Sequence, residues 1–229
     1  MSSDIKGISS MATRQVLADL VAAYQARTGV VVAIESVGGV DAAKRVLAGE
    51  AFDVVILASD AIAKLVSAGR VVEGSPVDLV HSGVAVAVRS GAPLPDISSE
   101  DAVRLAVLAA RTISYSTGPS GVALAQLFER WGISDEIKNR IVQAPPGVPV
   151  GALVARGDVD LGFQQLSELL HVAGISIVGP LPPAIQITTT FTAGLVAGSA
   201  QPDAVRAMLD FMRSPAAVEA KRHQGMEPA

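Results

Sequence analysis

Residues 49–65 read GEAFDVVILASDAIAKL, and this stretch decides the fold. Its apolar run at 54–57 predicts a short buried strand, the small residues at 58–60 predict a turn, and the spacing after them predicts an amphipathic helix. In open α/β sheets, ligands bind where the carboxyl ends of strands meet helix N-termini, whose free N–H groups suit anions. The same strand–turn–helix unit recurs at 8–13 and 116–121. Three such turns predict an anion-binding cleft.

The composition excludes several classes of protein. Half of the 229 residues are hydrophobic, so the chain can bury a substantial core. A net charge of −4 without a basic stripe argues against nucleic-acid binding. The chain has no cysteine, which removes disulfides and thiolate chemistry, and its three histidines lack metal-ligand spacing. We therefore predict no metal site and no cofactor.

Targeting and membrane signals are weak. The chain enters a strand soon after Met1, without a charged segment followed by an apolar one, so the sequence as it stands predicts a cytoplasmic protein. It would be periplasmic if a signal peptide had been removed. Residues 172–202 are uncharged but contain four prolines and four glycines, so no apolar membrane helix fits there and we predict no membrane insertion.

The periodicity predicts alternating strands and helices along most of the chain. Apolar residues at helical spacing predict helices over about 13–27, from 41 to 49, and over 62–67, 100–110, 124–131, 152–156, 167–171 and 203–213. β-Branched and apolar runs predict strands at 30–35, 53–57, 82–89, 112–116, near 140–144, at 160–164 and at 184–196. The first half thus reads β-α-β-α-β-α, which implies a parallel sheet covered on both faces.

Two α/β series joined by extended segments predict a two-lobed protein. The first lobe would comprise residues 1–82 and 192–229, and the second 86–187, with hinge segments at 83–85 and 188–191. Two crossovers permit the lobes to close on a ligand held between them. A single doubly wound sheet is the alternative.

Four segments carry a resemblance to a known family. They are 16–29 (VLADLVAAYQARTG), 43–60 (AKRVLAGEAFDVVILASD), 120–132 (SGVALAQLFERWG) and 152–167 (ALVARGDVDLGFQQLS). In order and spacing the chain resembles the molybdate-binding proteins of ABC importers, within the wider group of periplasmic solute-binding proteins. The resemblance implies a type 2 periplasmic binding fold, a small anionic ligand and, if the protein is exported, an ABC permease as partner. We expect a monomer.

The match to the ligand site departs from the family pattern. Molybdate binders hold the oxyanion with serine hydroxyls and backbone N–H groups at the starts of the first two helices. The resemblance aligns those serines with Ala12 and Val40, and the pocket tyrosine of the family with Gln165. Coordination of a tetrahedral oxyanion by hydroxyls is therefore not expected from these three positions.

In the first lobe, candidate ligand-binding residues follow the strand ends. The hydroxyls of Ser9, Ser10 and Thr13 would bind ligand oxygens or simply cap the helix. Arg14 opposes the helix dipole in the first turn unless an anion is near, and arginine suits a bidentate carboxylate contact. Gly39 allows close approach of a ligand to the backbone. The turn residue Ser59 completes this set.

Asp41 has two readings. It is most simply the N-cap of the second helix. An acid beside an anion pocket would repel the ligand unless it exchanged a proton with it, so Asp41 is also a candidate base if the protein is an enzyme.

In the second lobe, candidates cluster at equivalent turns. The turn 117–121 resembles a nest for one end of an acid, and the proline-rich loop at 145–149 would line the cleft. Two amides end a buried strand, and one of them is expected to hydrogen-bond a ligand. The candidates in this lobe are Thr117, Ser120, Gly121, Gly147, Gln164 and Gln165.

Three functions remain open. The leading hypothesis is a solute-binding protein that closes on a small oxyanion or carboxylate. The rival is an enzyme on the same scaffold, because some proteins similar to the molybdate binders are isomerases of unsaturated tricarboxylic acids such as aconitate. A cytoplasmic ligand sensor is the third. Fold analogy by itself does not decide among them.

Overall fold

A computed structural model describes residues 4–145 and 148–229 of the chain. The chain divides into two compact units. Unit 1 comprises Met1–Ser82 and Thr190–Ala229, and unit 2 comprises Gly83–Thr189. Two long strands, β4 (Val77–Arg89) and β8 (Thr188–Leu195), have residues in both units. The chain thus leaves unit 1 along β4 and returns to it along β8.

Unit 1 contains a sheet in the order β2-β1-β3-β8-β4, with β9 paired to β4. Its other elements are β1 (Ile5–Ser10), α1 (Arg14–Thr28), β2 (Val32–Val37), α2 (Gly39–Leu47), β3 (Val54–Ala58), α3 (Ser59–Ser67), α9 (Pro202–Arg213), α10 (Val218–His223) and β9 (Met226–Pro228). Strand β1 runs parallel to both β2 and β3, whereas β8 is antiparallel to β3. The parallel arrangement predicted for the first three strands is therefore confirmed.

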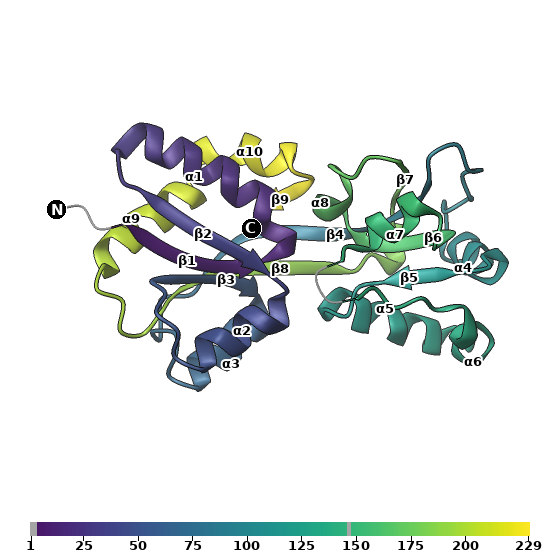
Figure 1. Cartoon of the computed structure of the whole chain (residues 1–229), viewed down its shortest axis with the longest axis horizontal. Coiled ribbons are helices and arrows are strands. Elements are labelled where there is room, and N and C mark those ends of the chain that lie inside the picture. Colours follow the sequence, from purple (N-terminus) through teal and green to yellow (C-terminus); the bar gives the residue numbers. More distant parts are fainter. Residues whose placement is uncertain (1–3, 146–147) are drawn as a thin grey trace. The chain divides into compact units, whose positions relative to one another are not determined.

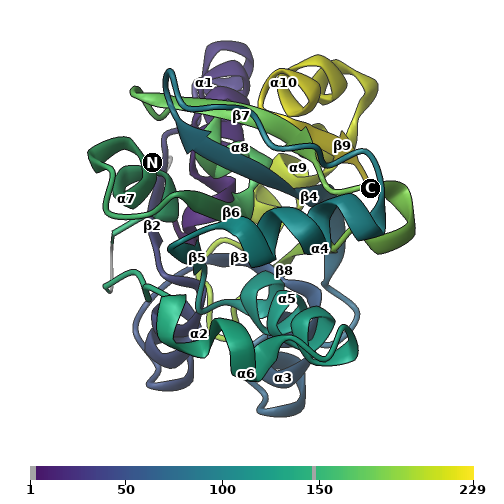
Figure 2. The ribbon, with the colours of Figure 1, turned by 90° about the vertical axis from the view of Figure 1, so that its right-hand side faces the viewer.

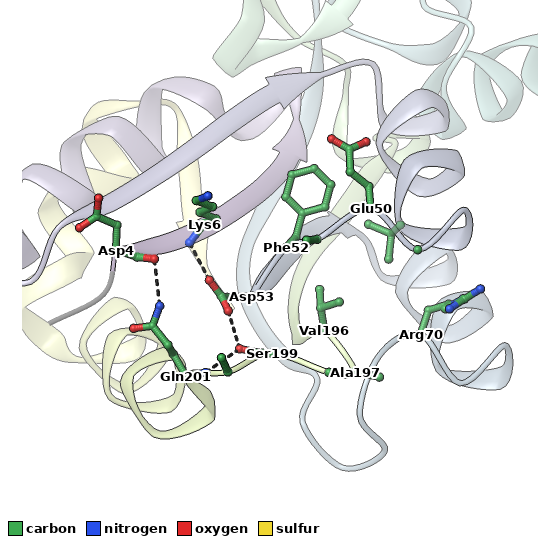
Figure 3. Close-up of a pocket in the computed structure, with 15 residues that line it drawn as sticks. Asp4, Lys6, Glu50, Phe52, Asp53, Arg70, Val196, Ala197, Ser199 and Gln201 are labelled. Carbon is green, nitrogen blue, oxygen red and sulfur yellow. Dashed lines mark hydrogen bonds between the residues drawn. The ribbon is translucent and has the colours of Figure 1, made fainter. Parts of the chain in front are cut away.

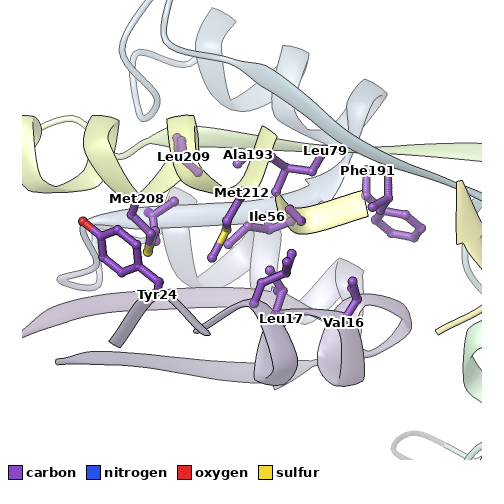
Figure 4. Packing of buried hydrophobic residues seen from close by; sticks show 14 of the residues in the cluster. Val16, Leu17, Tyr24, Ile56, Leu79, Phe191, Ala193, Met208, Leu209 and Met212 are labelled. Carbon is purple, nitrogen blue, oxygen red and sulfur yellow. The ribbon is translucent and has the colours of Figure 1, made fainter. Parts of the chain in front are cut away.

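Strand β3 separates two hydrophobic cores in unit 1 because its side chains alternate between the faces. Val54 and Ile56 belong to the core under α1 and α9, which Figure 4 shows closely packed around Met208 and Met212. Val55 and Leu57 belong to the core under α2 and α3. Figure 1 shows α1 and α2 on opposite sides of this sheet. Since both faces are covered, all five residues of β3 are buried.

Unit 2 repeats the α/β plan on a smaller sheet. Its elements are α4 (Glu100–Ala109), β5 (Ile113–Tyr115), α5 (Pro119–Arg130), α6 (Ser134–Ile137), α7 (Val150–Arg156), β6 (Leu161–Gln165), α8 (Leu166–Leu169) and β7 (Ile175–Pro180). Strand β6 is parallel to β5 and antiparallel to β4, which also pairs with β7. Figure 2 shows α5 on one side of β5 and β6 and α8 on the other.

The α/β fold class is confirmed, with one strand predicted wrongly. Residues near 140–144 form no regular strand in the described chain: a 3-10 turn covers Lys138–Arg140, and only Ile141 bridges to Ile113. The Arg140 guanidinium instead donates to the carbonyls of Leu108 and Ala110. Pro145 has no N–H to continue a ladder. The apolar residues here pack on neighbours without pairing as a strand.

Smaller departures have similar causes. The strand predicted at 184–196 begins only at Thr188, because prolines start a 3-10 turn over Pro183–Ile185. The second helix begins at Gly39 rather than Asp41. In the described part of the chain, no helix has the length and apolar character needed to cross a bilayer.

Candidate functional site

The carboxyl ends of β1, β2 and β3 lie at one edge of the unit 1 sheet, because the three strands are parallel. Ser9 and Ser36 face each other in register there, and their hydroxyl oxygens are 2.8 Å apart. Ser9 is fully buried. The Ser9 hydroxyl therefore belongs to the base of this edge, where it holds Ser36 in place.

Ser10 lies closer to the surface of the same edge. Its hydroxyl accepts a long hydrogen bond, 3.4 Å, from the Ala12 N–H, and it lies 3.6 Å from where a Cβ on Gly39 would be. A Cβ at Gly39 would be in ordinary van der Waals contact with Ser10, so the start of α2 lies beside this hydroxyl. Thr13 is buried, and its hydroxyl donates to the Ser10 carbonyl at 2.9 Å, so it closes the turn.

The remaining unit 1 candidates are exposed. Ser59 is the first residue of α3, and Asp41 lies in the first turn of α2. The Asp41 carboxylate lies close to Gly38: one of its oxygens is 3.4 Å from where a Cβ on Gly38 would be. A negative charge at this position stabilises the helix N-terminus. The prediction that Asp41 is the N-cap is therefore wrong: Gly38 is the N-cap of α2, and Asp41 lies in the first turn, where its charge suits the helix dipole.

Two hollows open on unit 1. One, of about 650 Å³, surrounds the amino ends of β1 and β3 (Figure 3). There Asp53 accepts from the Lys6 N–H at 2.9 Å and from the Ser199 hydroxyl at 2.6 Å, so both of its carboxylate oxygens are engaged. A second hollow runs between α1 and β2 and extends along β2 from Val32 to Ser36. Arg14 and Ser36 both line it, so this hollow reaches the carboxyl end of β2.

In unit 2, the turn between β5 and α5 is tightly built. The hydroxyls of Ser116 and Ser120 are 3.1 Å apart, and Thr117 is exposed beside them. Gly121 packs directly on this turn: a Cβ on it would lie 1.6 Å from the Ser116 carbonyl oxygen. Only glycine fits there, and its absence of a side chain brings the first turn of α5 against the strand end.

The N-terminus of α5 favours an anion. Its first turn consists of uncharged residues, beginning at Pro119, whereas α2, α3 and α4 each carry an acid in that turn. The positive end of the helix dipole is therefore left uncompensated by the first turn itself. Pro119 has no N–H, and the N–H groups of Gly121 and Val122 donate to the Gly118 carbonyl, so the Ser120 hydroxyl is the side-chain donor that this turn offers to ligand oxygens.

The two adjacent amides at the end of β6 have different roles. Gln164 accepts a hydrogen bond from the Gly151 N–H at 3.1 Å, on the face of the sheet that α7 covers. Gln165 alternates to the face that carries Phe163, which contacts Phe128 of α5. Its side-chain oxygen is buried and has no hydrogen-bond partner among the residues that the structure describes. A buried acceptor without a partner is costly, so it points to a ligand or water.

Glu168 is an acid that the sequence pattern does not single out. It is partly buried in α8, and its side chain is hydrogen-bonded to Gln164. Burial raises the pKa of Glu168 to about 7, while the bond from Gln164 favours the charged form and lowers the pKa. This carboxyl group therefore changes charge near neutral pH.

Three residues join the candidate set from the structure alone. Ser36 is identified by its pairing with Ser9, Ser116 by its contact with Ser120, and Glu168 by its burial. Ser36 could have been chosen from the sequence, because it carries a hydroxyl near the end of a predicted strand, as Ser9 does. The predicted ligand residue Gly147 lies outside the described residues. In the described chain, no group of three or more His, Asp or Glu side chains is arranged to hold a metal ion.

Comparisons with known proteins agree with this architecture. A family model for bacterial extracellular solute-binding proteins matches residues 5–227. A protein named aconitate isomerase, from a Pseudomonas species, is 40% identical, covering 96% of this chain and 86% of its own length. The periplasmic molybdate-binding protein of Azotobacter vinelandii has a TM-score of 0.81 and 22% identity, covering 97% of this chain and 98% of its own.

The tungstate ABC transporter structure from Geobacter sulfurreducens is also similar, with a TM-score of 0.75 and 16% identity, over 95% of this chain and 97% of that one. At such identities these two structures show the fold alone. The resemblance to molybdate-binding proteins is thus confirmed for the fold. Because the family model covers nearly the whole sequence, this chain belongs to the bacterial extracellular solute-binding protein family.

Proposed function

We propose that this protein binds a small polycarboxylate and isomerises an unsaturated tricarboxylate of the aconitate type. The observation that carries the proposal is its 40% identity, across 96% of the chain, to a protein named aconitate isomerase. The solved molybdate and tungstate proteins, at 22% and 16% identity, argue for the same scaffold but not for the same ligand.

The local chemistry of both units supports a carboxylate ligand. Unit 1 offers the Ser10 hydroxyl next to the start of α2, and unit 2 offers Ser120 at the start of α5. Taken by itself, each set of donors suits a carboxylate group. Ala12 and Val40, at the positions aligned with the oxyanion-binding serines of molybdate binders, provide no hydroxyl.

The proposed reaction moves one proton within the substrate. A base removes a proton from the methylene carbon between a carboxylate and the double bond, and the electron pair spreads over the allylic system. The same proton, or one from the same acid, then returns to the carbon at the far end. The double bond moves by one position, and the cis and trans forms interconvert without any oxidant or cofactor.

The test is an assay of the purified protein with cis- and trans-aconitate in D2O, followed by proton NMR. We expect interconversion of the two isomers, with deuterium entering the allylic methylene position. Failure of both isomers to interconvert or exchange, with a folded protein, would contradict the proposal.

The second candidate function is that of a substrate-binding receptor for an ABC importer. It is favoured because the family model that matches residues 5–227 describes bacterial extracellular solute-binding proteins. It requires an ABC permease as partner and an exported protein. A thermal-shift comparison separates the two: a ligand at 100 times its dissociation constant adds about 2.7 kcal/mol of stability. Stabilisation by molybdate or tungstate without turnover of tricarboxylates would favour the receptor.

A further inference from the structure

Strand β2 lies at the end of the unit 1 sheet, and β1 is its only neighbour among the described strands. In a parallel pair, successive residues point their backbone N–H and C=O groups alternately toward the neighbouring strand and away from it. The Ile5 N–H donates to the Val31 carbonyl, whereas the Val32 N–H turns outward to the side chain of Gln25 in α1. Every second residue of β2 thus faces away from the sheet, namely Val32, Ile34 and Ser36.

Most of these outward backbone groups are unpaired. Gln25 accepts from the Val32 N–H at 2.9 Å and so closes the beginning of the edge. In the described part of the chain, the outward N–H and C=O groups of Ile34 and Ser36 and the C=O group of Val32 have no hydrogen-bond partner. A row of unpaired groups on an edge strand is a template on which another strand can pair.

We propose that β2 pairs antiparallel with β2 of a second copy of this chain, with Ile34 on the twofold axis. In such a dimer each copy contributes the same surface, so the strand must be complementary to itself. The proposal is independent of the ligand and of the proposed reaction. It departs from the monomer expected from the sequence.

Hydrogen bonding and charge select this register. With the axis at Ile34, each Ile34 bonds to its own copy, and the Ser36 N–H donates to the carbonyl of Val32 in the other copy, so β2 pairs over nearly its whole length. An axis at Glu35 would place two carboxylates directly opposite each other, which is destabilising. An axis at Ala33 would move the carboxyl end of β2 past the first residue of the other strand.

The side chains also match in this register. Ala33, which is small, lies opposite Glu35 of the other copy. Arg45 donates to both oxygens of the Glu35 carboxylate, at 2.7 and 2.9 Å, so this charge is compensated within each copy. Val31, which is 50% exposed, lies opposite Val37 of the other copy. Pairing therefore covers an apolar side chain and brings no like charges directly opposite each other.

The hollow beside β2 leaves room for the second strand. It has a volume of about 870 Å³ and runs between α1 and β2, where Leu17, Val21 and Ile34 form apolar walls. Ile34 packs against the core under α1, so its side chain lies on that face of the sheet. In the dimer, Ile34 of the second copy would lie beside it on the same face, because opposite residues of an antiparallel pair are neighbours. Apolar surface of both side chains would then leave water.

The chain contains no cysteine, so a single introduced thiol reports on a single contact. Ile34→Cys should form a disulfide-linked dimer under mild oxidation, because Cα atoms of a hydrogen-bonded antiparallel pair are about 5.5 Å apart, within the range of disulfides. Ser36→Cys is the matched control, because in this register the Cα atoms of its two copies would lie about 14 Å apart. We expect at least about tenfold more cross-linked dimer for Ile34→Cys than for Ser36→Cys on a non-reducing gel.

Analytical ultracentrifugation of wild type over roughly 5–200 μM measures the association directly, since an interface formed by one strand is small and binds weakly. We expect a reversible monomer–dimer equilibrium. Ile34→Pro removes the N–H that crosses the axis but spares the ladder to β1, because this N–H points outward. Its dimer dissociation constant should rise at least about tenfold, since the two hydrogen bonds across the axis are lost. Ile34→Val, which keeps the N–H, should retain the equilibrium of wild type.

A folded wild type that stays monomeric across this concentration range would overturn the proposal. Cross-linking of Ser36→Cys as readily as Ile34→Cys would also overturn it, because the register would then be wrong or the disulfides would come from random collisions. If Ile34→Pro fails to fold, the two cysteine variants decide the question, because both keep every backbone N–H of β2.

Discussion

Gly121 shows how far one residue can be restricted by its neighbours. It lies inside α5, where alanine would normally be favoured by about 1 kcal/mol over glycine. A Cβ at this position would lie 1.6 Å from the Ser116 carbonyl oxygen and 2.6 Å from its carbon, both of them backbone atoms. The turn that carries the candidate anion site must therefore move if Gly121 is replaced.

We expect Gly121→Ala to destabilise unit 2 by about 1–3 kcal/mol despite its better helix propensity. It should also weaken ligand binding, because the shifted turn carries Ser116 and Ser120. Urea unfolding followed by the fluorescence of Trp131 measures the first effect, since this is the single tryptophan of the chain and lies in unit 2.

Gly118→Ala is the matched control, because its Cβ would approach nothing closer than the Ser116 hydroxyl at 3.9 Å. A Gly121→Ala variant as stable as Gly118→Ala would contradict the packing described for this turn.

The titration of Glu168 should also appear in the stability of the protein. Burial raises its pKa from 4.5 to about 7, so between these values the folded protein holds a proton that the unfolded chain has released. The free energy of unfolding must therefore fall as the pH rises through this window, by about 3 kcal/mol at most.

Glu168→Gln removes this titration, so the variant should gain stability over wild type at pH 8 and show little difference at pH 4. Urea unfolding at a series of pH values measures both proteins. Parallel pH profiles of wild type and variant between pH 4 and 8 would show that this carboxyl group is not shifted.

At the scale of elements, the end of α4 depends on a residue distant from it in sequence. Arg140 donates to the carbonyl oxygens of Leu108 and Ala110 at 2.7 and 2.8 Å, where the helix leaves carbonyls without intrahelical partners. A cation at a helix C-terminus also interacts favourably with the dipole. This use of Arg140 explains why the segment that follows departs from the strand its apolar residues predict.

We expect Arg140→Met to destabilise unit 2 by about 1–2 kcal/mol, because it leaves two partly buried carbonyls without their donor. Lys138→Met is the control: Lys138 forms an exposed ion pair with Asp135, and such a pair contributes about 0–1 kcal/mol. Equal Trp131 unfolding midpoints for the two variants would exclude a capping role for Arg140.

At the scale of the whole molecule, the hydrophobic cores keep within the two units. The cores around α1 and α9 and around α2 and α3 contain only unit 1 residues, and those of the other sheet contain only unit 2 residues. Burial of apolar surface is the main stabilising term of folding. Each unit therefore has its own source of stability. Closure of the predicted lobes on a ligand stays a prediction.

Met212→Ala tests this independence. Met212 is fully buried among residues from both ends of the chain (Figure 4), so its truncation should cost unit 1 about 2–5 kcal/mol. Far-UV circular dichroism should then show an earlier transition for part of the signal, while Trp131 fluorescence in unit 2 keeps its midpoint. Coincident shifts of both signals would show that the two units unfold as one.

The sequence by itself determined the fold class and most of the regular elements, although it did not predict β7, β9, α6 or α10. The helical stripe Val205, Met208, Leu209 and Met212 is entirely buried, and the apolar run of β3 is buried on both faces. These features are local, because the period of apolar residues follows from the geometry of helix and strand. The turns with Ser9, Ser10, Ser120 and Gly121 could be chosen for the same reason, since they follow strand ends; their binding of a ligand stays a prediction.

Only the tertiary structure decided which of these groups are already engaged. Thr13 and Gln164 are committed to internal hydrogen bonds, whereas the Gln165 oxygen has no partner in the described chain. The burial that changes the pKa of Glu168 comes from elements distant in sequence, so no local pattern announces it. Hydrogen-bond partners and desolvation depend on which residues surround a group in space. Those residues come from distant parts of the sequence and meet only when the chain has folded.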